Sequence, residues 1–167
     1  RIKVFKNRNR SLREIVESSA NHGDNEYIVC EEQRITFREH LARVSAVAHK
    51  LRHTYGVKPG DRVAILADNH PQWIITFWAT VSIGGICAGL NGWWNRDEIL
   101  HALHDAQPKL LLGDRKRLAR IAGVDLPFPV LCLEDDFALL EQGWDAQEGK
   151  APALPDCQIA EDDPALI

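Results

Sequence analysis

The feature that most constrains the fold is a long uncharged stretch, WIITFWATVSIGGICAGLNGWW, which runs from Trp73 to Trp94. A membrane-spanning helix needs about 20 mostly apolar residues in unbroken helical register. Gly84 and Gly85 interrupt this register, because two glycines in a helix interior cost roughly 2 kcal/mol relative to two alanines. The flanks carry Asp68 and Asp97 and lack the clustered lysines that are typical of membrane spans. The stretch is therefore predicted to form the interior of a fold rather than a membrane anchor.

The glycine pair divides the stretch into two expected elements. Asn69 or His70 can cap a helix with Pro71 in its first turn, where the missing N–H is harmless. This helix is expected to run to about Ile83 and to be largely buried, because its apolar residues recur at helical spacing without an opposing polar face. The apolar run ICAGL, residues 86–90, is expected to be a strand covered on both faces.

The remaining sequence alternates between short apolar runs and helical patterns. Helices are predicted from Ser11 to Gly23, Thr36 to Gly56, Asn95 to His104 and Asp114 to Ile121, and over 137–142. Strands are predicted over 62–67, 109–113 and 129–134. A β-hairpin is predicted over 26–37, on either side of Glu32 and Gln33. Capping-box patterns open the first three of these helices. Such alternation predicts right-handed crossovers. We therefore expect an α/β fold with a mostly parallel, doubly wound sheet flanked by helices and an N-terminal β-hairpin.

Length and composition indicate one compact unit. The chain has 167 residues, 45% of them hydrophobic and 26% charged, and its formal net charge of -4 gives no overall attraction for nucleic acid. The four cysteines (Cys30, Cys87, Cys132 and Cys157) are widely spaced, which favours reduced structural thiols over a disulfide framework. The basic start, RIKVFKNRNR, lacks the apolar region of a secretion signal, so a cytoplasmic location is expected.

The two ends of the chain have distinct compositions. Residues 1–10 are expected to be a basic arm, and residues 143–163, rich in Pro, Ala, Gly and acidic residues, a loop or linker. The sequence PALI, residues 164–167, matches the first half of another apolar strand. Because a natural domain seldom ends on an unfinished buried strand, residues 1–167 are expected to be a partial N-terminal domain of a longer protein.

Three segments follow one another along the chain: ITFREHL (35–41), GDRVAILADNHPQWIITFWATVSIGGICAGLN (60–91) and DEILHALHDAQPKLLLGD (97–114). In this order they resemble the opening of the adenylate-forming, or AMP-binding, superfamily, and most closely a bacterial-type fatty acyl-CoA synthetase. The first segment is similar to the early TYxEL motif of that family, and residues 81–91 to its second motif, AGAxxxPLNP. The resemblance spans nearly the whole chain but only the first portion of such an enzyme.

The resemblance implies an ATP-dependent, AMP-forming ligase whose full-length chain uses ATP, Mg2+ and CoA. In such an enzyme a carboxylate, here expected to be that of a fatty acid, attacks the α-phosphate of ATP, and the CoA thiol then opens the acyl-adenylate. The family's phosphate-binding loop follows an acidic-Pro-Ala-hydrophobic strand, and EDDPALI, residues 161–167, resembles the start of that strand. The loop and the C-terminal domain are therefore expected to be absent. No catalytic, cofactor-binding or metal-binding residue is assigned, and residues 1–167 alone are expected to be inactive and to bind none of these cofactors.

Departures from the family pattern leave the acyl substrate open. Gly89 and Gly92 stand where the second motif usually has prolines, and Trp93 and Trp94 fill the following loop. Another adenylate-forming enzyme, such as an aryl-acid or amino-acid adenylation domain or a luciferase-like enzyme, is one alternative. A stand-alone, non-enzymatic α/β module that binds a ligand or partner at the carboxyl ends of its strands is another. The two tryptophans could line an acyl pocket or mark a subunit contact, but packing on the missing half of the domain is favoured.

Other patterns have ordinary structural interpretations. His49 with His53, and His101 with His104, have spacings that suit a metal, but neither pair has an evident third ligand, so solvated or capping histidines are expected. The glycines at 84, 85, 89 and 92 do not match the dinucleotide-binding fingerprint and are expected to allow close packing and a tight turn. The basic arm could touch acidic lipid, but it lacks an amphipathic apolar face and is expected to be solvated. Self-association through an apolar face is also considered.

Overall fold

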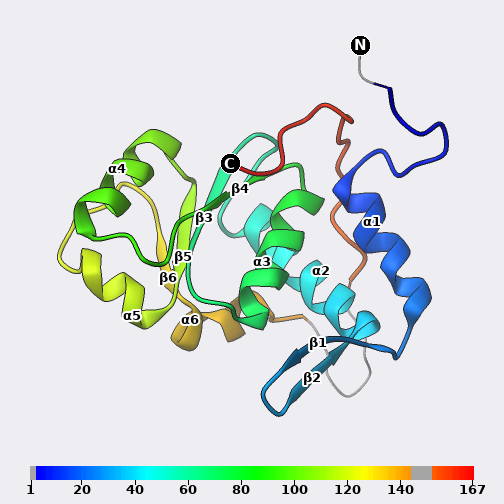
Figure 1. The fold of residues 1–167 in the computed structure, drawn as a ribbon, viewed down its shortest axis with the longest axis horizontal. Coiled ribbons are helices and arrows are strands. Elements are labelled where there is room, and N and C mark those ends of the chain that lie inside the picture. The colour runs from blue at the N-terminus through cyan, green and yellow to red at the C-terminus, as the bar shows by residue number, and fades with distance from the viewer. Residues whose placement is uncertain (1–2, 144–151) are drawn as a thin grey trace.

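The computed structural model describes residues 3–143 and 152–167, which form an α/β fold with helices on both faces of a sheet (Figure 1). The helices are α1 (Leu12–Ser19), α2 (Phe37–His53), α3 (Pro71–Ser82), α4 (Arg96–Ala106), α5 (Arg115–Leu118) and α6 (Leu133–Leu140), with 3-10 segments η1 (Ala20–His22) and η2 (Ala119–Ile121). The strands are β1 (Glu26–Cys30), β2 (Gln33–Thr36), β3 (Arg62–Leu66), β4 (Ile86–Gly89), β5 (Leu110–Gly113) and β6 (Val130–Cys132).

Strands β3 to β6 form a parallel sheet in the order β4-β3-β5-β6. The central strand β3 pairs with β4 on one side, where Val63 lies opposite Cys87, and with β5 on the other, where Val63 lies opposite Leu110. Strands β1 and β2 form a separate antiparallel hairpin. The predicted fold class, parallel sheet and N-terminal hairpin are confirmed.

The predicted break at the glycine pair is also confirmed. Helix α3 ends at Ser82, and Gly84 has a φ of 74°, a left-handed conformation that residues with a Cβ rarely adopt. Gly85 is so closely packed that an added Cβ would lie 3.0 Å from Cγ2 of Thr80 and 3.1 Å from its carbonyl oxygen. Strand β4 begins at the next residue. Across residues 3–143 and 152–167, no helix combines the length and the apolar character needed to cross a membrane.

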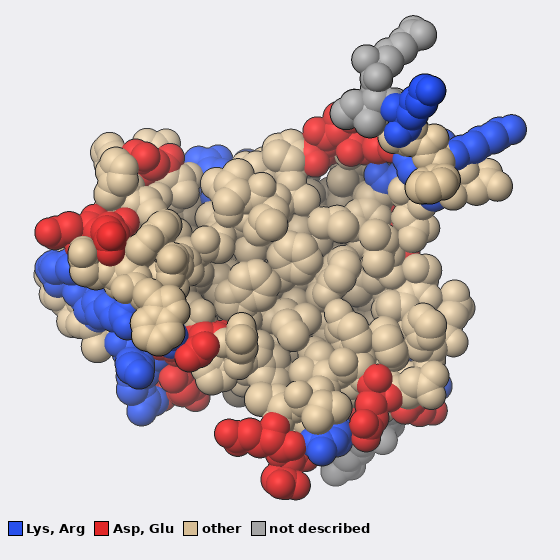
Figure 2. Space-filling view, viewed as in Figure 1, with Lys and Arg blue, Asp and Glu red and all other residues tan. Residues whose placement is uncertain are grey.

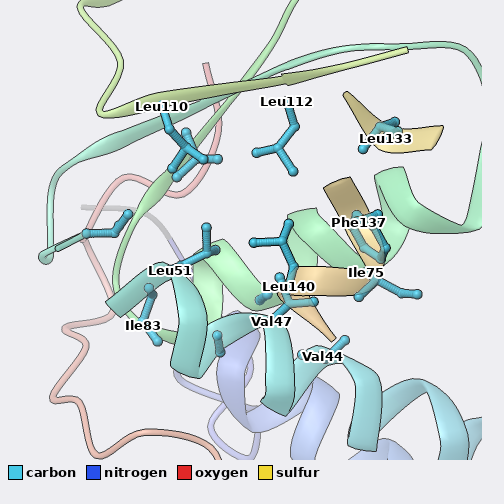
Figure 3. Packing of buried hydrophobic residues seen from close by; sticks show 14 residues of the cluster. Val44, Val47, Leu51, Ile75, Ile83, Leu110, Leu112, Leu133, Phe137 and Leu140 are labelled. Carbon is cyan, nitrogen blue, oxygen red and sulfur yellow. The ribbon is translucent and has the colours of Figure 1, made fainter. Parts of the chain in front are cut away.

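Apolar residues cover both faces of the sheet, because successive strand residues point to opposite sides. Val63, Leu110 and Leu112 belong to the larger buried cluster, which α2, α3 and α6 complete (Figure 3). Ala64 and Leu111 belong to a second cluster, which α4 and η2 cover. Since burying one leucine side chain contributes about 1.5–3 kcal/mol, these two clusters account for a large part of the folding free energy.

Capping side chains set the first residues of two long helices. At α2, the Thr36 hydroxyl accepts a hydrogen bond from the Glu39 N–H at 3.2 Å, and the Glu39 carboxylate accepts one from the Thr36 N–H at 2.8 Å. Asn95 and Glu98 make the same reciprocal pair at α4. Both predicted capping boxes are therefore present, and each satisfies two N–H groups that a helix start leaves free.

The predicted box at α1 forms only in part. Ser11 accepts a hydrogen bond from the Glu14 N–H at 3.2 Å, as expected. The Glu14 carboxylate instead accepts a hydrogen bond from the N–H of Arg10, at 2.6 Å.

The strand predicted over 129–134 is too long, and the helix after it begins earlier than the predicted residue 137. Strand β6 ends at Cys132 and α6 begins at Leu133. The carboxylate of Asp136 accepts a hydrogen bond from the Cys132 N–H at 2.8 Å, and three acidic residues place negative charge at the positive end of the helix dipole. These local interactions favour a helix in a segment whose apolar residues alone suggested a strand.

Two other boundaries also differ. The hairpin turn lies at Glu31 and Glu32, one residue earlier than predicted, and Glu31 has a φ of 52°. The helix predicted from Asp114 to Ile121 consists of the single turn α5 followed by η2.

Both chain ends contact the body of the fold. Arg8 and Arg10 pair with Glu161, so the arm that was expected to be solvated is held in part by ion pairs. Arg13 of α1 donates hydrogen bonds to the carbonyl of Pro155 at 2.6 Å and to that of Ser82 at 3.0 Å. Residues 144–151 of the expected loop lie outside the described residues, and residues 152–163 contain no helix or strand.

The last residues of the chain lie along β4. The Cys87 N–H donates to the carbonyl of Ala165 at 2.9 Å, and the Ile167 N–H donates to the carbonyl of Cys87 at 3.0 Å. This parallel bridge agrees with the strand expected at residues 164–167.

We expect Gly84→Ala to destabilise the fold more than Gly123→Ala, although both glycines have a φ near 75°. Both changes carry the left-handed penalty of about 1–2 kcal/mol. Only at position 84 would the new Cβ also meet neighbours, at 3.1 Å from Cβ of Pro59 and 3.4 Å from Sγ of Cys157, which adds roughly 1 kcal/mol. Urea denaturation of the two variants measures the difference, and equal unfolding free energies would contradict the packing argument.

Candidate functional site at the carboxyl edge of the sheet

The first place to look for a ligand site is the edge where the parallel strands end. In open α/β sheets, ligands bind outside the carboxyl ends of the strands, at the point where the strand order reverses. The chain passes from β3 to β4 on one side and then to β5 on the other, so this point lies between β3 and β5. Asp68 follows β3 and Asp114 follows β5, which places two carboxylates at the reversal.

Arg117 of α5 fills the space between these carboxylates. Its Nη1 donates to Asp114 Oδ2 at 2.6 Å, and its Nη2 donates to Asp68 Oδ2 at 3.1 Å. The Asp114 carboxylate also accepts hydrogen bonds from the backbone N–H of Asp68 at 2.9 Å and from the backbone N–H of Arg117 at 2.8 Å. Asp114 and Arg117 are buried, with 3% and 7% of their surfaces exposed. The three side chains therefore form one cross-braced network.

The network holds both acids in their charged form. Burial alone would raise the pKa of the Asp114 carboxyl, but the backbone N–H groups of Arg117 and Asp68 and the Arg117 guanidinium hold it below its usual value. The pKa of the Asp68 carboxyl is lowered by the N–H of Asn69 and then by Arg117. Both carboxylates are thus already neutralised by a cation of the protein itself.

The loop between β4 and α4 joins the same network. The carbonyl of Gly92 accepts hydrogen bonds from Arg117 Nε at 3.1 Å and from Arg120 Nη1 at 2.7 Å. The carbonyl of Trp94 accepts a hydrogen bond from Arg120 Nη1 at 2.8 Å. A Cβ at position 92 would lie 2.5 Å from Arg117 Nε, so this close approach requires glycine. Trp93 points outward from the loop with 88% of its surface exposed, while Trp94 packs against the second apolar cluster. Trp94 thus packs within this chain, whereas the expected packing of Trp93 on another part of the domain stays a prediction.

This geometry suits a structural role better than ligand binding. A phosphate would have to displace two carboxylates from Arg117, and a metal ion would have to displace Arg117 from those carboxylates. Within residues 3–143 and 152–167, no group of three or more His, Cys, Asp and Glu side chains could hold a metal ion. The reversal point is occupied by the protein's own ion pairs, which connect the ends of three strands.

The two predicted histidine pairs are not brought together with further ligands. The rings of His49 and His53 stack with centroids 5.6 Å apart, and His49 Nε2 lies 2.8 Å from the carbonyl oxygen of Ala153. His101 lies 3.5 Å from the carboxylate of Asp105 on the surface of α4. His53, His101 and His104 are exposed and His49 is half-buried, and the expectation that neither pair binds a metal stays a prediction.

The glycines and cysteines also have structural environments. The close-packing interpretation holds for Gly84, Gly85 and Gly92, whereas an added Cβ at Gly89 would meet only Trp73, at an ordinary 3.8 Å. All four cysteines are free, and burial raises the pKa of the Cys87 thiol to about 12, which makes it a poor nucleophile.

The sequence reasoning missed the Arg117 network. An aspartate directly after a buried strand, with an arginine three residues later, is a recognisable local pattern. The pattern does not reveal Asp68 or the Gly92 carbonyl, because both are distant in the sequence.

We expect Arg117→Met to cost about 3 kcal/mol of unfolding free energy, because it leaves the buried Asp114 carboxylate without its cation. Arg115→Met is the matched control: Arg115 lies two residues away, and its ion pair with Asp135 is exposed on both sides, so the substitution should leave the urea midpoint unchanged. Equal losses in the two variants would show that the network does not stabilise the fold.

Comparison with solved structures identifies the architecture. The anthranilate CoA ligase AuaEII, in complex with anthranoyl-AMP, superposes with a TM-score of 0.81 and 19% identity over 93% of this chain and 30% of that one. The N-terminal subdomain of NpsA from Klebsiella oxytoca gives a TM-score of 0.74 and 23% identity over 93% of this chain and 37% of that one. At these identities the likeness shows the fold.

Curated relatives share more sequence. A 3-hydroxybenzoate–CoA/4-hydroxybenzoate–CoA ligase of Thauera aromatica is 30% identical over 149 residues, 86% of this chain and 28% of that protein. The medium/long-chain-fatty-acid–CoA ligase FadD6 of Mycobacterium tuberculosis is 31% identical over 105 residues, 62% of this chain and 17% of that protein. The chain thus spans less than a third of either relative.

A family model described as AMP-binding enzyme matches residues 15–167. This match covers most of the chain, including the parallel sheet, α2 to α6 and the segment that bridges to β4. The chain therefore belongs to the family of AMP-binding, adenylate-forming enzymes and has the fold of the N-terminal part of their domains.

Proposed function

We propose that the protein carrying this chain is an ATP-dependent acid–CoA ligase. It would activate a carboxylic acid as an acyl-adenylate and transfer the acyl group to CoA, releasing pyrophosphate and AMP. The observation that carries this proposal is the family match over residues 15–167, together with the hydroxybenzoate–CoA ligase relative that aligns with 86% of the chain.

Within the protein, residues 1–167 would act as a scaffold. Two local features support this role: Gly84 and Gly85 are packed against Pro59 and Thr80, and the carboxylates at the reversal point are bound by Arg117. The groups that hold ATP, Mg2+ and CoA would then lie in another part of the protein. We also propose that residues 1–167 are inactive by themselves. We further propose that the enzyme is cytoplasmic, which the four free thiols of this chain support.

The acid is proposed to be a fatty acid, in keeping with the motif resemblance and with the relative FadD6. An aryl acid is an equal competitor, because the hydroxybenzoate–CoA ligase aligns with more of the chain.

We expect the whole protein that carries this chain to release pyrophosphate when it is mixed with ATP, Mg2+, CoA and a suitable acid. A series of fatty acids and hydroxybenzoates, measured in parallel, identifies the acid by its kcat/KM. Residues 1–167 alone are expected to give no turnover. Turnover by residues 1–167 would refute the scaffold role, and formation of an acyl-adenylate without transfer to CoA would favour an adenylation domain instead.

The surface suggests that another part of the protein covers this chain. Figure 2 shows a broad central face, over α3 and β4, that is almost free of charged side chains, with acidic and basic groups gathered around its margin. Trp73 and Phe77 of α3 stack with ring centroids 6.0 Å apart and are only partly buried. Such an uncharged expanse is typical of an interaction surface.

We expect residues 1–167 by themselves to self-associate through this face. Size-exclusion chromatography with light scattering should give a mass that rises with protein concentration, and high salt should not reverse it, because apolar contacts are not screened. A monomer whose mass is independent of concentration would argue against the covered face.

A further inference from the structure

A buried histidine on α2 has no role in the network at the sheet edge. His40 lies in the first turns of α2 and has 1% of its surface exposed. Neither Nδ1 nor Nε2 has a hydrogen-bond partner within the described residues. A neutral imidazole carries one donor and one acceptor, so both are left unsatisfied at a cost in free energy.

The ring of His40 is covered by the β1–β2 hairpin. The Tyr27 ring of β1 lies against it, with centroids 4.6 Å apart at an angle of 57°. Tyr27 also packs against Phe37, with centroids 4.6 Å apart, and its hydroxyl accepts a hydrogen bond from Trp78 Nε1 of α3 at 3.2 Å. Tyr27 thus contacts both α2 and α3.

The hairpin depends on such contacts. It is a two-stranded sheet that shares no strand with the parallel sheet, and an isolated hairpin is marginally stable in water. Its other anchors are the buried side chains of Ile28 and Ile35 and two backbone hydrogen bonds near its base, from the Phe37 N–H to the Asn25 carbonyl at 3.1 Å and from the Arg38 N–H to the Gly23 carbonyl at 3.0 Å. Because the hairpin shares no strand with the parallel sheet, it can open while that sheet stays folded, and weakening the Tyr27 contact shifts the hairpin toward the open form.

A proton on His40 would meet an unfavourable environment. Arg43 is one turn further along α2, and its guanidinium is bound to Glu141, which follows α6, at 2.5 Å. Tyr27 is the titratable group of β1 at the ring, and His22 of η1 is one aromatic ring away through Phe37. Burial first, and then the charge of Arg43, lower the pKa of His40 to about 4.

We infer that His40 and Tyr27 form a pH-sensitive latch, in which proton uptake by the His40 ring releases the β1–β2 hairpin while the parallel sheet stays folded. In the open form the ring is hydrated and takes its proton near pH 6.5, whereas in the closed form it does so only near pH 4. The closed form is therefore fully favoured above pH 6.5 and loses its advantage as the pH falls toward 4. From pH 7 to pH 5, the opening equilibrium constant should rise about 20-fold.

Hydrogen exchange measured by mass spectrometry tests this inference. After correction for intrinsic exchange rates, amides of β1 and β2 should lose about 20-fold in protection between pH 7 and pH 5, and amides of β3 and β5 should not. Unchanged hairpin protection, or equal loss in hairpin and sheet, would overturn the latch.

Two variants assign the effect to one ring. His40→Phe keeps an aromatic side chain that cannot be protonated and should abolish the pH-dependent loss, whereas His53→Phe, at an exposed position of the same helix, should retain it. Persistence of the loss in His40→Phe would overturn the assignment. If His40→Phe fails to fold, NMR titration of His40 in the unmodified chain replaces this variant. A His40 ring that titrates near the ordinary pKa of histidine while the hairpin stays closed contradicts the latch. A ring that titrates only as the hairpin opens supports it.

Discussion

The fold depends on the close contact between the glycine pair and the end of the helix before it. Gly84 turns the chain through a left-handed conformation, and a Cβ at Gly85 would lie only 3.0 Å from Cγ2 of Thr80, closer than side-chain atoms ordinarily pack. This turn converts an uncharged segment, long enough to resemble a membrane span, into a helix that packs on the sheet and a largely buried strand at one end of the strand order. Strand β4 pairs with β3 directly after the turn.

A second constraint acts at the opposite ends of the strands. Arg117 joins the residues that follow β3, β4 and β5 through two carboxylates and one carbonyl. At the point where many α/β proteins bind a ligand, this chain holds its own ion pairs. The arrangement supports the proposal that this chain is a scaffold within an adenylate-forming enzyme.

Much of the fold could be predicted from local sequence signals. The glycine pair, the capping pairs at Thr36 and Asn95, and the alternation of apolar strands with helices each depend on residues close together in the chain, and each is present in the structure. The boundary between β6 and α6 was wrong, because an acidic cap outweighed an apolar pattern. The network around Arg117 and the burial of His40 could not be predicted, since both arise from residues that only tertiary packing brings together.

The most direct test of the account is an NMR measurement of residues 73–90. We expect helical chemical shifts that stop at Ser82, extended shifts from Ile86 to Gly89, and nuclear Overhauser contacts between Cys87 and Val63 across the parallel pair. Continuous helical shifts from Trp73 through Leu90, without contacts to β3, would contradict the division of this segment into helix α3 and strand β4.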